Sequence, residues 1–177
     1  MPALSLEKAR NTAIVKGPNI ADLPPIEPLA SDIRPITLLR VGDNISTDTI
    51  SPAGSEAMPY RANVPAISQF CFRDIDPDYA QQGKDHQHEG HVIVAGFNYG
   101  QGSSREHAVL APRYLGLRMV LAKSFARIQQ QNLINAGVLA LTFIDEADYE
   151  RIEPGDYLQV TDLHNAVDGG RDIVVEV

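Results

Sequence analysis

Blocks of apolar residues, separated by polar and glycine-rich stretches, predict a regular series of strands and helices in the central part of the chain. Four blocks are short and mainly apolar, as buried strands are: 36–41, which is also rich in β-branched residues, 91–95, 118–122 and 138–142. Residues 104–114 and 125–136 lie between the last three blocks, carry apolar residues at helical spacing, and stop before Gly116 and Gly137. This order predicts an α/β domain with parallel strands and right-handed crossovers.

Further expectations concern burial and one additional short helix. The helix at 125–136 should bury one apolar face, made of Phe125, Ile128, Leu133 and Ile134. A short helix is predicted at 66–72. The charged stretch 74–90 should be exposed to solvent.

The two ends of the chain differ from the centre. Prolines at positions 18, 24, 25, 28 and 35 obstruct helices and sheet pairing near the N-terminus. We therefore divide the chain into an N-terminal arm or linker, residues 1–35, and a compact domain, residues 36–177. Near the C-terminus, 156–161 and 173–177 look like strands joined by a loop that holds Gly169 and Gly170, which predicts a mixed sheet rather than a doubly wound one.

Composition narrows the class of protein and partner. The chain of 177 residues is 44% hydrophobic and 21% charged, which is ordinary for a soluble globular domain with a sizeable core. Its formal net charge of −8 argues against nucleic acid and anionic membranes, since both are bound by basic patches, but not against a small anionic substrate. Residues 1–20 lack the apolar segment of a signal peptide, and no stretch is long enough to span a membrane, so we expect a cytoplasmic protein.

The single cysteine, Cys71, limits the redox and metal chemistry of the chain. One cysteine can neither close an intrachain disulfide nor hold an iron–sulfur cluster, which takes several thiolates, so we expect a buried apolar residue. The acidic repeat at 74–78 lacks the glycine and glutamate of a calcium-binding loop, and the histidines within 86–91 lack the spacing typical of zinc sites. We therefore expect no metal bound by this chain.

The segment 96–107 gives the strongest chemical signal. It follows a predicted strand, holds three glycines within 96–102 that allow tight turns, and passes into a predicted helix at Ser103 and Ser104. Unpaired N–H groups and the positive end of the helix dipole favour anions at such a position. Arg105 adds a planar donor group suited to a carboxylate or a phosphate. We interpret the segment as an anion-binding loop.

Other interpretations of this loop account for fewer of its residues. Ser103 and Glu106 have the spacing of a capping box, which would make both residues structural, but a cap requires neither a second serine nor Arg105. Arg105 stands where a dinucleotide-binding loop has its third glycine, and the Gly-Lys-Ser/Thr of a P-loop is absent. A Gly-x-Ser-x-Gly nucleophile elbow is also absent.

Several separated segments resemble the swivel domain of the aconitase family. Residues 98–108, Asn-Tyr-Gly-Gln-Gly-Ser-Ser-Arg-Glu-His-Ala, are similar to its signature, which continues through 111–116 and 123–128. Upstream, 46–54 resembles a second segment of the family. The similarity runs in order over roughly 36–160, most of the chain, and implies a three-layer β/β/α swivelling domain with a mixed sheet.

The resemblance also implies a role for individual residues. Ser103 is similar to the general base that removes the carbon-bound proton, with Asp48 as a supporting catalytic residue. Ser104 and Arg105 resemble binders of a substrate carboxylate, and Arg61 resembles a further carboxylate-binding arginine. A serine is a poor base unless its alkoxide is stabilised, and a helix start with nearby arginines would stabilise it.

Aconitases are hydro-lyases that interconvert citrate and isocitrate through cis-aconitate, so the resemblance implies a tricarboxylate substrate. It also implies a four-iron four-sulfur cluster that other domains bind, with none bound by this chain. We expect the chain to be inactive alone. It would act as a small subunit, or as the C-terminal part of a longer enzyme, together with the cluster-bearing domains or large subunit.

Two alternatives stay open. The small subunits of isopropylmalate and homoaconitate hydro-lyases share the Gly-Ser-Ser-Arg-Glu-like loop, and only segments such as 50–54 and 123–128 favour an aconitase. A swivel-type domain could also bind an anion without catalysing a reaction, although retention of Ser103 argues against a non-catalytic anion-binding module.

Overall fold

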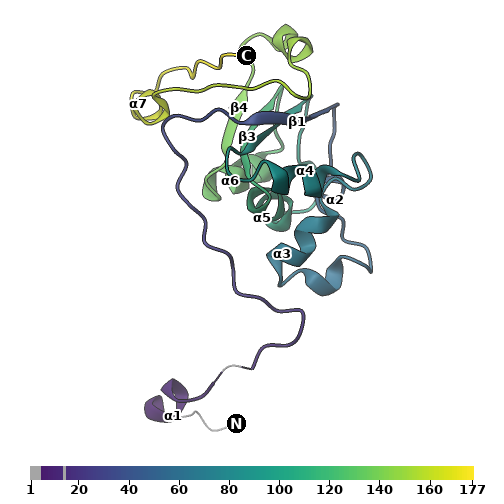
Figure 1. Cartoon of the computed structure of the whole chain (residues 1–177), viewed down its shortest axis with the longest axis vertical. Coiled ribbons are helices and arrows are strands. Elements are labelled where there is room, and N and C mark those ends of the chain that lie inside the picture. Colours follow the sequence, from purple (N-terminus) through teal and green to yellow (C-terminus); the bar gives the residue numbers. More distant parts are fainter. Residues whose placement is uncertain (1–4, 14) are drawn as a thin grey trace.

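The computed structural model describes residues 5–13 and 15–177, and at the centre of this part lies a four-stranded parallel sheet (Figure 1). The strands stand in the order in which they occur along the chain: β1 (Ile36–Val41), β2 (His91–Ala95), β3 (Leu117–Ala122) and β4 (Leu139–Thr142). Each of the four strands predicted in the central part of the chain is present to within one residue. The α/β prediction is confirmed.

Short helices fill the connections between the strands. The α-helices are α1 (Leu6–Arg10), α2 (Thr47–Ile50), α3 (Val64–Ile67), α4 (Tyr79–Asp85), α5 (His107–Tyr114), α6 (Arg127–Asn135) and α7 (Leu163–Asp168). Three 3-10 helices span Met58–Tyr60, Ser68–Phe70 and Glu146–Arg151. Because β1 to β4 are in sequence order and crossovers share one hand, the helices that connect them cover the same face of the sheet.

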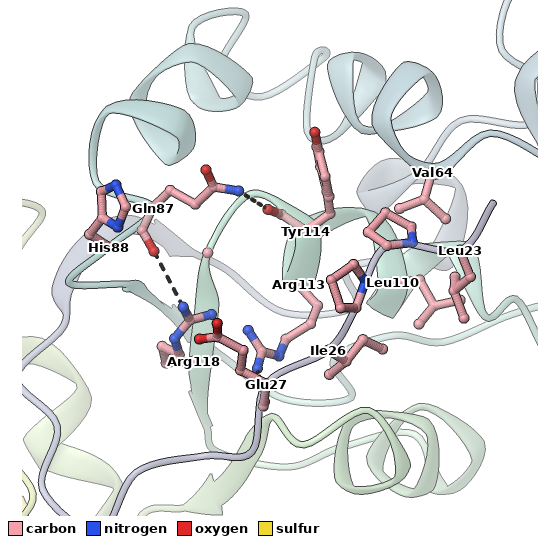
Figure 2. A pocket seen from close by; sticks show the side chains of 13 residues that line it. Leu23, Ile26, Glu27, Val64, Gln87, His88, Leu110, Arg113, Tyr114 and Arg118 are labelled. Carbon is pink, nitrogen blue, oxygen red and sulfur yellow. Dashed lines mark hydrogen bonds between the residues drawn. The ribbon is translucent and has the colours of Figure 1, made fainter. Parts of the chain in front are cut away.

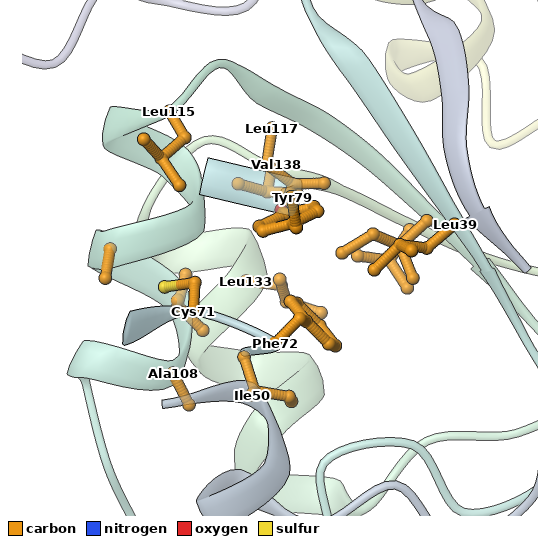
Figure 3. Close-up of a cluster of buried hydrophobic side chains, with 14 of the residues drawn as sticks. Leu39, Ile50, Cys71, Phe72, Tyr79, Ala108, Leu115, Leu117, Leu133 and Val138 are labelled. Atoms are coloured by element: carbon orange, nitrogen blue, oxygen red, sulfur yellow. The ribbon is translucent and has the colours of Figure 1, made fainter. Parts of the chain in front are cut away.

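The alternation of side chains along the strands divides the core in two. In β2, Ile93 and Ala95 face a core that α5 and α6 cover, and Figure 3 shows part of that core. Val92 and Val94 face the opposite side, where Leu158 belongs to a second core. The C-terminal segment that contains Leu158 therefore forms a third layer over the sheet, as the three-layer prediction requires.

Antiparallel pairing in this third layer is more limited than the sequence suggests. Residues 156–161 and 173–177 form isolated antiparallel bridges, Ile33–Val160, Ile36–Tyr157 and Gln159–Glu176, rather than continuous strands. Pro35 lies in the middle of the first pairing, where it accepts a hydrogen bond from Leu158 N at 3.0 Å but has no N–H to donate. The ladder is therefore interrupted at the proline.

Three helices have bounds that differ from the predicted ones. The helix predicted at 66–72 is one α-helical turn, α3, followed by a 3-10 turn, and Asn63 Oδ1 caps it by accepting Ala66 N at 3.1 Å. Helices α5 and α6 begin later than predicted, at His107 and Arg127.

The apolar face predicted for α6 is wrong at two positions. Ile128 and Ile134 are 52% and 56% exposed, whereas Leu133 is buried as predicted. The two residues of α6 that face the core, four positions apart, are instead Gln129 and Leu133. Gln129 is 1% exposed, packs under the loop after β2, and donates from Nε2 to Ala108 O at 3.2 Å. A polar residue therefore occupies a core position that hydrophobicity alone could not predict.

Followed back from β1, the N-terminal arm contacts the domain through residues 21–27 and then leads to α1 (Figure 1). Between residues 17 and 35 it forms no helix or strand apart from the bridge at Ile33, and Ala21 N donates to Ala62 O at 3.0 Å. Residues 1–4 and 14 of the predicted arm lie outside the described residues, and the boundary at residue 36 stays a prediction. None of the helices in the described ranges is long and apolar enough to cross a membrane.

The first residue of β2 is a buried histidine. His91 is fully buried, and its Nε2 lies 2.7 Å from Tyr79 Oη, while Nδ1 has no partner among the described residues. Burial, and after it the positive charges of Arg118 and His86, together lower the pKa of His91 to about 3.

We predict that His91 makes the fold sensitive to acid. Its pKa in the folded state lies below the unfolded value of about 6.5, so protons bind preferentially to the unfolded chain. The free energy of unfolding should be highest above about pH 6.5 and fall by up to about 1.4 kcal/mol per pH unit toward pH 3. Urea titrations at several pH values measure this slope. His91→Gln cannot titrate and should show a shallower dependence; equal slopes for both proteins would contradict the prediction.

Candidate active site

Loops that follow the first three strands meet at the carboxyl edge of the sheet, where open α/β sheets commonly bind ligands. We call them the β1 loop, the β2 loop and the β3 loop: residues 42–51, 96–106 and 123–126. Thr47 N of the β1 loop donates to Gln101 O of the β2 loop at 2.9 Å, and Tyr99 N of the β2 loop donates to Ser124 O of the β3 loop at 3.0 Å. Backbone hydrogen bonds thus fix the three loops against one another.

Glycine is required where the β2 loop crosses α6. Gly100 has a φ of +80°, and a Cβ at this position would lie 2.1 Å from Cγ of Gln129. The backbone therefore needs both the left-handed conformation and the absence of a side chain. Close contact with a buried residue of α6 determines the path of the loop toward Ser103.

The two serines lie ahead of α5 rather than within it. Helix α5 begins at His107, and Ser103 and Ser104 are exposed loop residues, so the predicted helix start is corrected by three residues. Gly102, with a φ of +103°, stands outside helical geometry just before them. Glu106 is the N-cap and has no side-chain cap hydrogen bond, so the structure does not form the alternative capping box.

The structure brings Asp48 and Arg105 together from loops 57 residues apart in sequence. Arg105 Nη2 donates to Asp48 Oδ2 at 3.1 Å, Nη1 donates to Oδ1, and Nη1 also lies 3.4 Å from Ser51 O. The hydrogen bond from Arg105 holds the pKa of the Asp48 carboxyl below its usual value. Asp48 is therefore a carboxylate at neutral pH that orients the guanidinium.

Arg61 is held next to the start of α5 by its backbone. It follows the 3-10 helix Met58–Tyr60, is exposed, and accepts a hydrogen bond on its carbonyl oxygen from His107 Nε2 at 2.6 Å. Sequence reasoning quoted His107 in the loop but gave it no function. Because the sequence places the helix start at Ser104, it gave no signal that His107 would be the first residue of α5.

Ser103 lines an open hollow of about 660 Å³ between the β2 loop and the first turns of α6. Gly100 and Gly102 share its wall, and the opposite wall includes the exposed Arg127. The other predicted site residues do not line it: Asp48, Arg61, Ser104 and Arg105. Arg127 is a cation to which the sequence analysis gave no role, although a residue that follows the short loop after the third parallel strand can be placed at the carboxyl edge.

The described residues offer no ligand set for a metal or a cluster. No group of three or more His, Cys, Asp or Glu side chains within 5–13 and 15–177 could hold a metal ion. Cys71 is 1% exposed, and burial raises the pKa of its thiol, which opposes the thiolate form that ligates iron. The side chain packs in the core beneath α5 (Figure 3).

Comparisons with known proteins agree on one family. Residues 63–146 match the model of the aconitase C-terminal domain. The chain is 46% identical over 123 residues to a 3-isopropylmalate dehydratase small subunit of Halothermothrix orenii, covering 70% of this chain and 69% of that protein. It is 38% identical over 172 residues to a putative mitochondrial aconitate hydratase of Emericella nidulans, covering 85% of this chain but only 22% of that protein.

The fold comparison gives the same result. The crystal structure of 3-isopropylmalate dehydratase from Methanocaldococcus jannaschii superposes with a TM-score of 0.62 and 32% sequence identity, covering 82% of this chain and 81% of that one. The chain thus spans most of a small subunit but about a fifth of an aconitate hydratase. Because one relative is mitochondrial, a cytoplasmic location stays a prediction.

Proposed function

Because this chain belongs to the aconitase family and corresponds to its C-terminal swivel domain, we propose that it is the part of a hydro-lyase that covers the substrate and supplies the base and the carboxylate binders. The observation that carries the proposal is the carboxyl edge of the sheet, where Ser103 lines an open hollow and Asp48 orients Arg105 in the neighbouring loop. The base, the arginine and its orienting carboxylate are thus on loops that a rigid sheet positions.

Each residue has a defined task in this proposal. The Ser103 alkoxide takes the proton from the carbon next to a substrate carboxylate. In the reverse reaction the Ser103 hydroxyl gives the proton back to that carbon. Ser104 and Arg105 hold a carboxylate, with N–H groups of Arg105 that Asp48 does not occupy. Arg61 holds a further carboxylate. The exposed Arg127 adds positive potential next to Ser103, which favours ionisation of the hydroxyl.

The remaining chemistry belongs to other parts of the enzyme. The residues of this chain do not fit a cluster, so we propose that a four-iron four-sulfur cluster in cluster-bearing domains, or in a large subunit, assists departure of the substrate hydroxyl. Relatives named as small subunits support a partner of this kind. Without that partner the chain should be inactive.

Among substrates of the family we propose citrate and isocitrate. The wall of the hollow beside Ser103 holds the exposed cation Arg127 next to apolar Ala126 and Ile128, and a cation at this place suits a third carboxylate better than an isopropyl group. The match to an aconitate hydratase also covers more of this chain, 85%, than the match to the small subunit, 70%.

A second candidate is dehydration of 3-isopropylmalate. The observation in its favour is the higher sequence identity to the isopropylmalate dehydratase small subunit, 46% against 38%. Both candidates use the same Ser103 chemistry and differ only in the group that fills the rest of the site.

Reconstitution tests the proposal. The purified chain, the cluster-bearing partner and their mixture are each assayed with citrate, 3-isopropylmalate and homocitrate. We expect turnover only in the mixture, with the highest kcat/KM for citrate. A preference for 3-isopropylmalate would select the second candidate. Failure of an intact, cluster-loaded mixture on all three substrates, with citrate still bound by the chain alone, would instead indicate a non-catalytic anion-binding module.

A further inference from the structure

Two arginines lie close together at the end of α5 that is opposite to the Ser103 loop. Arg113 is in the last turn of α5, and Arg118 follows in β3. Together with residues 23–27 of the N-terminal arm they line a cavity of about 340 Å³ (Figure 2). Arg113 is 7% exposed, so this is a buried cation and not a solvated surface charge.

The donors of these guanidiniums are incompletely used. Arg113 Nη2 donates to Glu27 O at 2.7 Å and Nε lies 3.4 Å from Ala136 O. Arg118 Nη2 donates to Gln87 O at 3.3 Å, while its buried Nη1 has no partner among the described residues. The acceptors are neutral backbone carbonyls, and a buried guanidinium nitrogen without an acceptor is unfavourable.

The positive charge is also poorly neutralised. Figure 2 shows the Glu27 carboxylate turned toward both guanidiniums, and it is the one acidic side chain that lines the cavity. Even so, no carboxylate in the described part of the chain lies within ion-pair distance of either arginine. Burial lowers the pKa of Arg113 to about 10, and the charge of Arg118 contributes, so both arginines remain charged at neutral pH.

We propose that this cavity binds a small oxyanion between Arg113 and Arg118, with the free Nη1 of Arg118 as a principal donor, and that the oxyanion competes with the Glu27 carboxylate. Planar guanidiniums are suited to the oxygens of a phosphate or a carboxylate. Glu27 is exposed and belongs to the arm, so it can move away without disturbing the core. The cavity shares no residue with the hollow beside Ser103, so this site is independent of the proposed reaction.

Phosphate titration of the 177-residue chain at constant ionic strength tests the proposal, with the side-chain Nε–Hε resonances of arginines as the readout. The Arg113 and Arg118 resonances should shift and saturate in the millimolar range. A parallel titration with acetate shows whether the site prefers a phosphate or a carboxylate.

Three variants locate the site. Arg118→Met should weaken phosphate binding at least about tenfold, because the free donor and its charge are lost. Glu27→Gln, an exposed substitution that leaves the core intact, should tighten binding about threefold or more by removing the competing carboxylate. Arg105→Lys should leave this affinity unchanged. Unchanged or weaker affinity in Glu27→Gln, saturation that is insensitive to Arg118→Met, or loss of binding in Arg105→Lys alone would each overturn the proposal.

Discussion

Replacing Ser103 by alanine should lower kcat of the reconstituted hydro-lyase by about 10³-fold, because the hydroxyl transfers the proton in the transition state. KM should stay nearly unchanged, because this group does not contribute to binding of the substrate in the ground state. Ser103 is exposed and lies in the loop ahead of α5, so the substitution should not alter the fold. Steady-state kinetics with citrate in the reconstituted enzyme measure the effect, and circular dichroism verifies the structure.

The neighbouring serine provides the matched control. Ser104 is also exposed and lies in the same loop, but its proposed task is carboxylate binding. Ser104→Ala should therefore raise KM about tenfold or less, with a smaller loss of kcat, as expected for one hydrogen bond to a charged group. Wild-type kcat in Ser103→Ala, or equal effects of both substitutions, would remove the base assignment.

Arg105→Lys should raise KM for citrate by about 10- to 100-fold, because an ammonium cannot reproduce the planar set of donors. In the structure one guanidinium donates to both oxygens of Asp48 and approaches Ser51 O, which leaves its remaining N–H groups in a fixed direction. Lysine would keep the charge but lose this orientation. Substrate saturation curves and the affinity of a competitive tricarboxylate inhibitor measure the change.

An arginine outside the three loops separates the loss of orientation from a general effect of the substitution. Arg151 forms an exposed ion pair with Asp148 at 2.8 Å and does not line the hollow beside Ser103, and Arg151→Lys should leave KM unchanged. An unchanged KM in Arg105→Lys would remove that residue from the substrate site. A large KM increase in both variants would indicate a non-specific effect.

Local patterns were sufficient where a segment's structure depends on its own residues. The buried strands at 36–41 and 91–95 have the predicted bounds, since continuous apolar β-branched runs between turn residues have few alternatives. The β2 loop was also predicted correctly as a glycine-rich connection, because a tight path after a strand requires glycine.

Long-range contacts were not predictable in the same way. The bidentate pair of Asp48 and Arg105 joins two loops that are far apart in sequence. Helix α5 begins only at His107, because Gly102 has a non-helical backbone and the Arg105 side chain is bound to Asp48. Burial of Gln129 depends on a backbone 29 residues earlier, at Gly100, where the periodicity of α6 carries no information. The approach of the arm to Arg113 likewise has no local signal in the sequence.

The contact between Gly100 and Gln129 restricts how this domain can diverge. A Cβ at position 100 would overlap the Gln129 side chain, and Gln129 also donates to the backbone of α5, so neither position can change alone. In a directed-evolution library for a new substrate, these two codons should stay fixed or be randomised as a pair. Variation is better placed at the exposed residues 54–56, which lie outside the hollow.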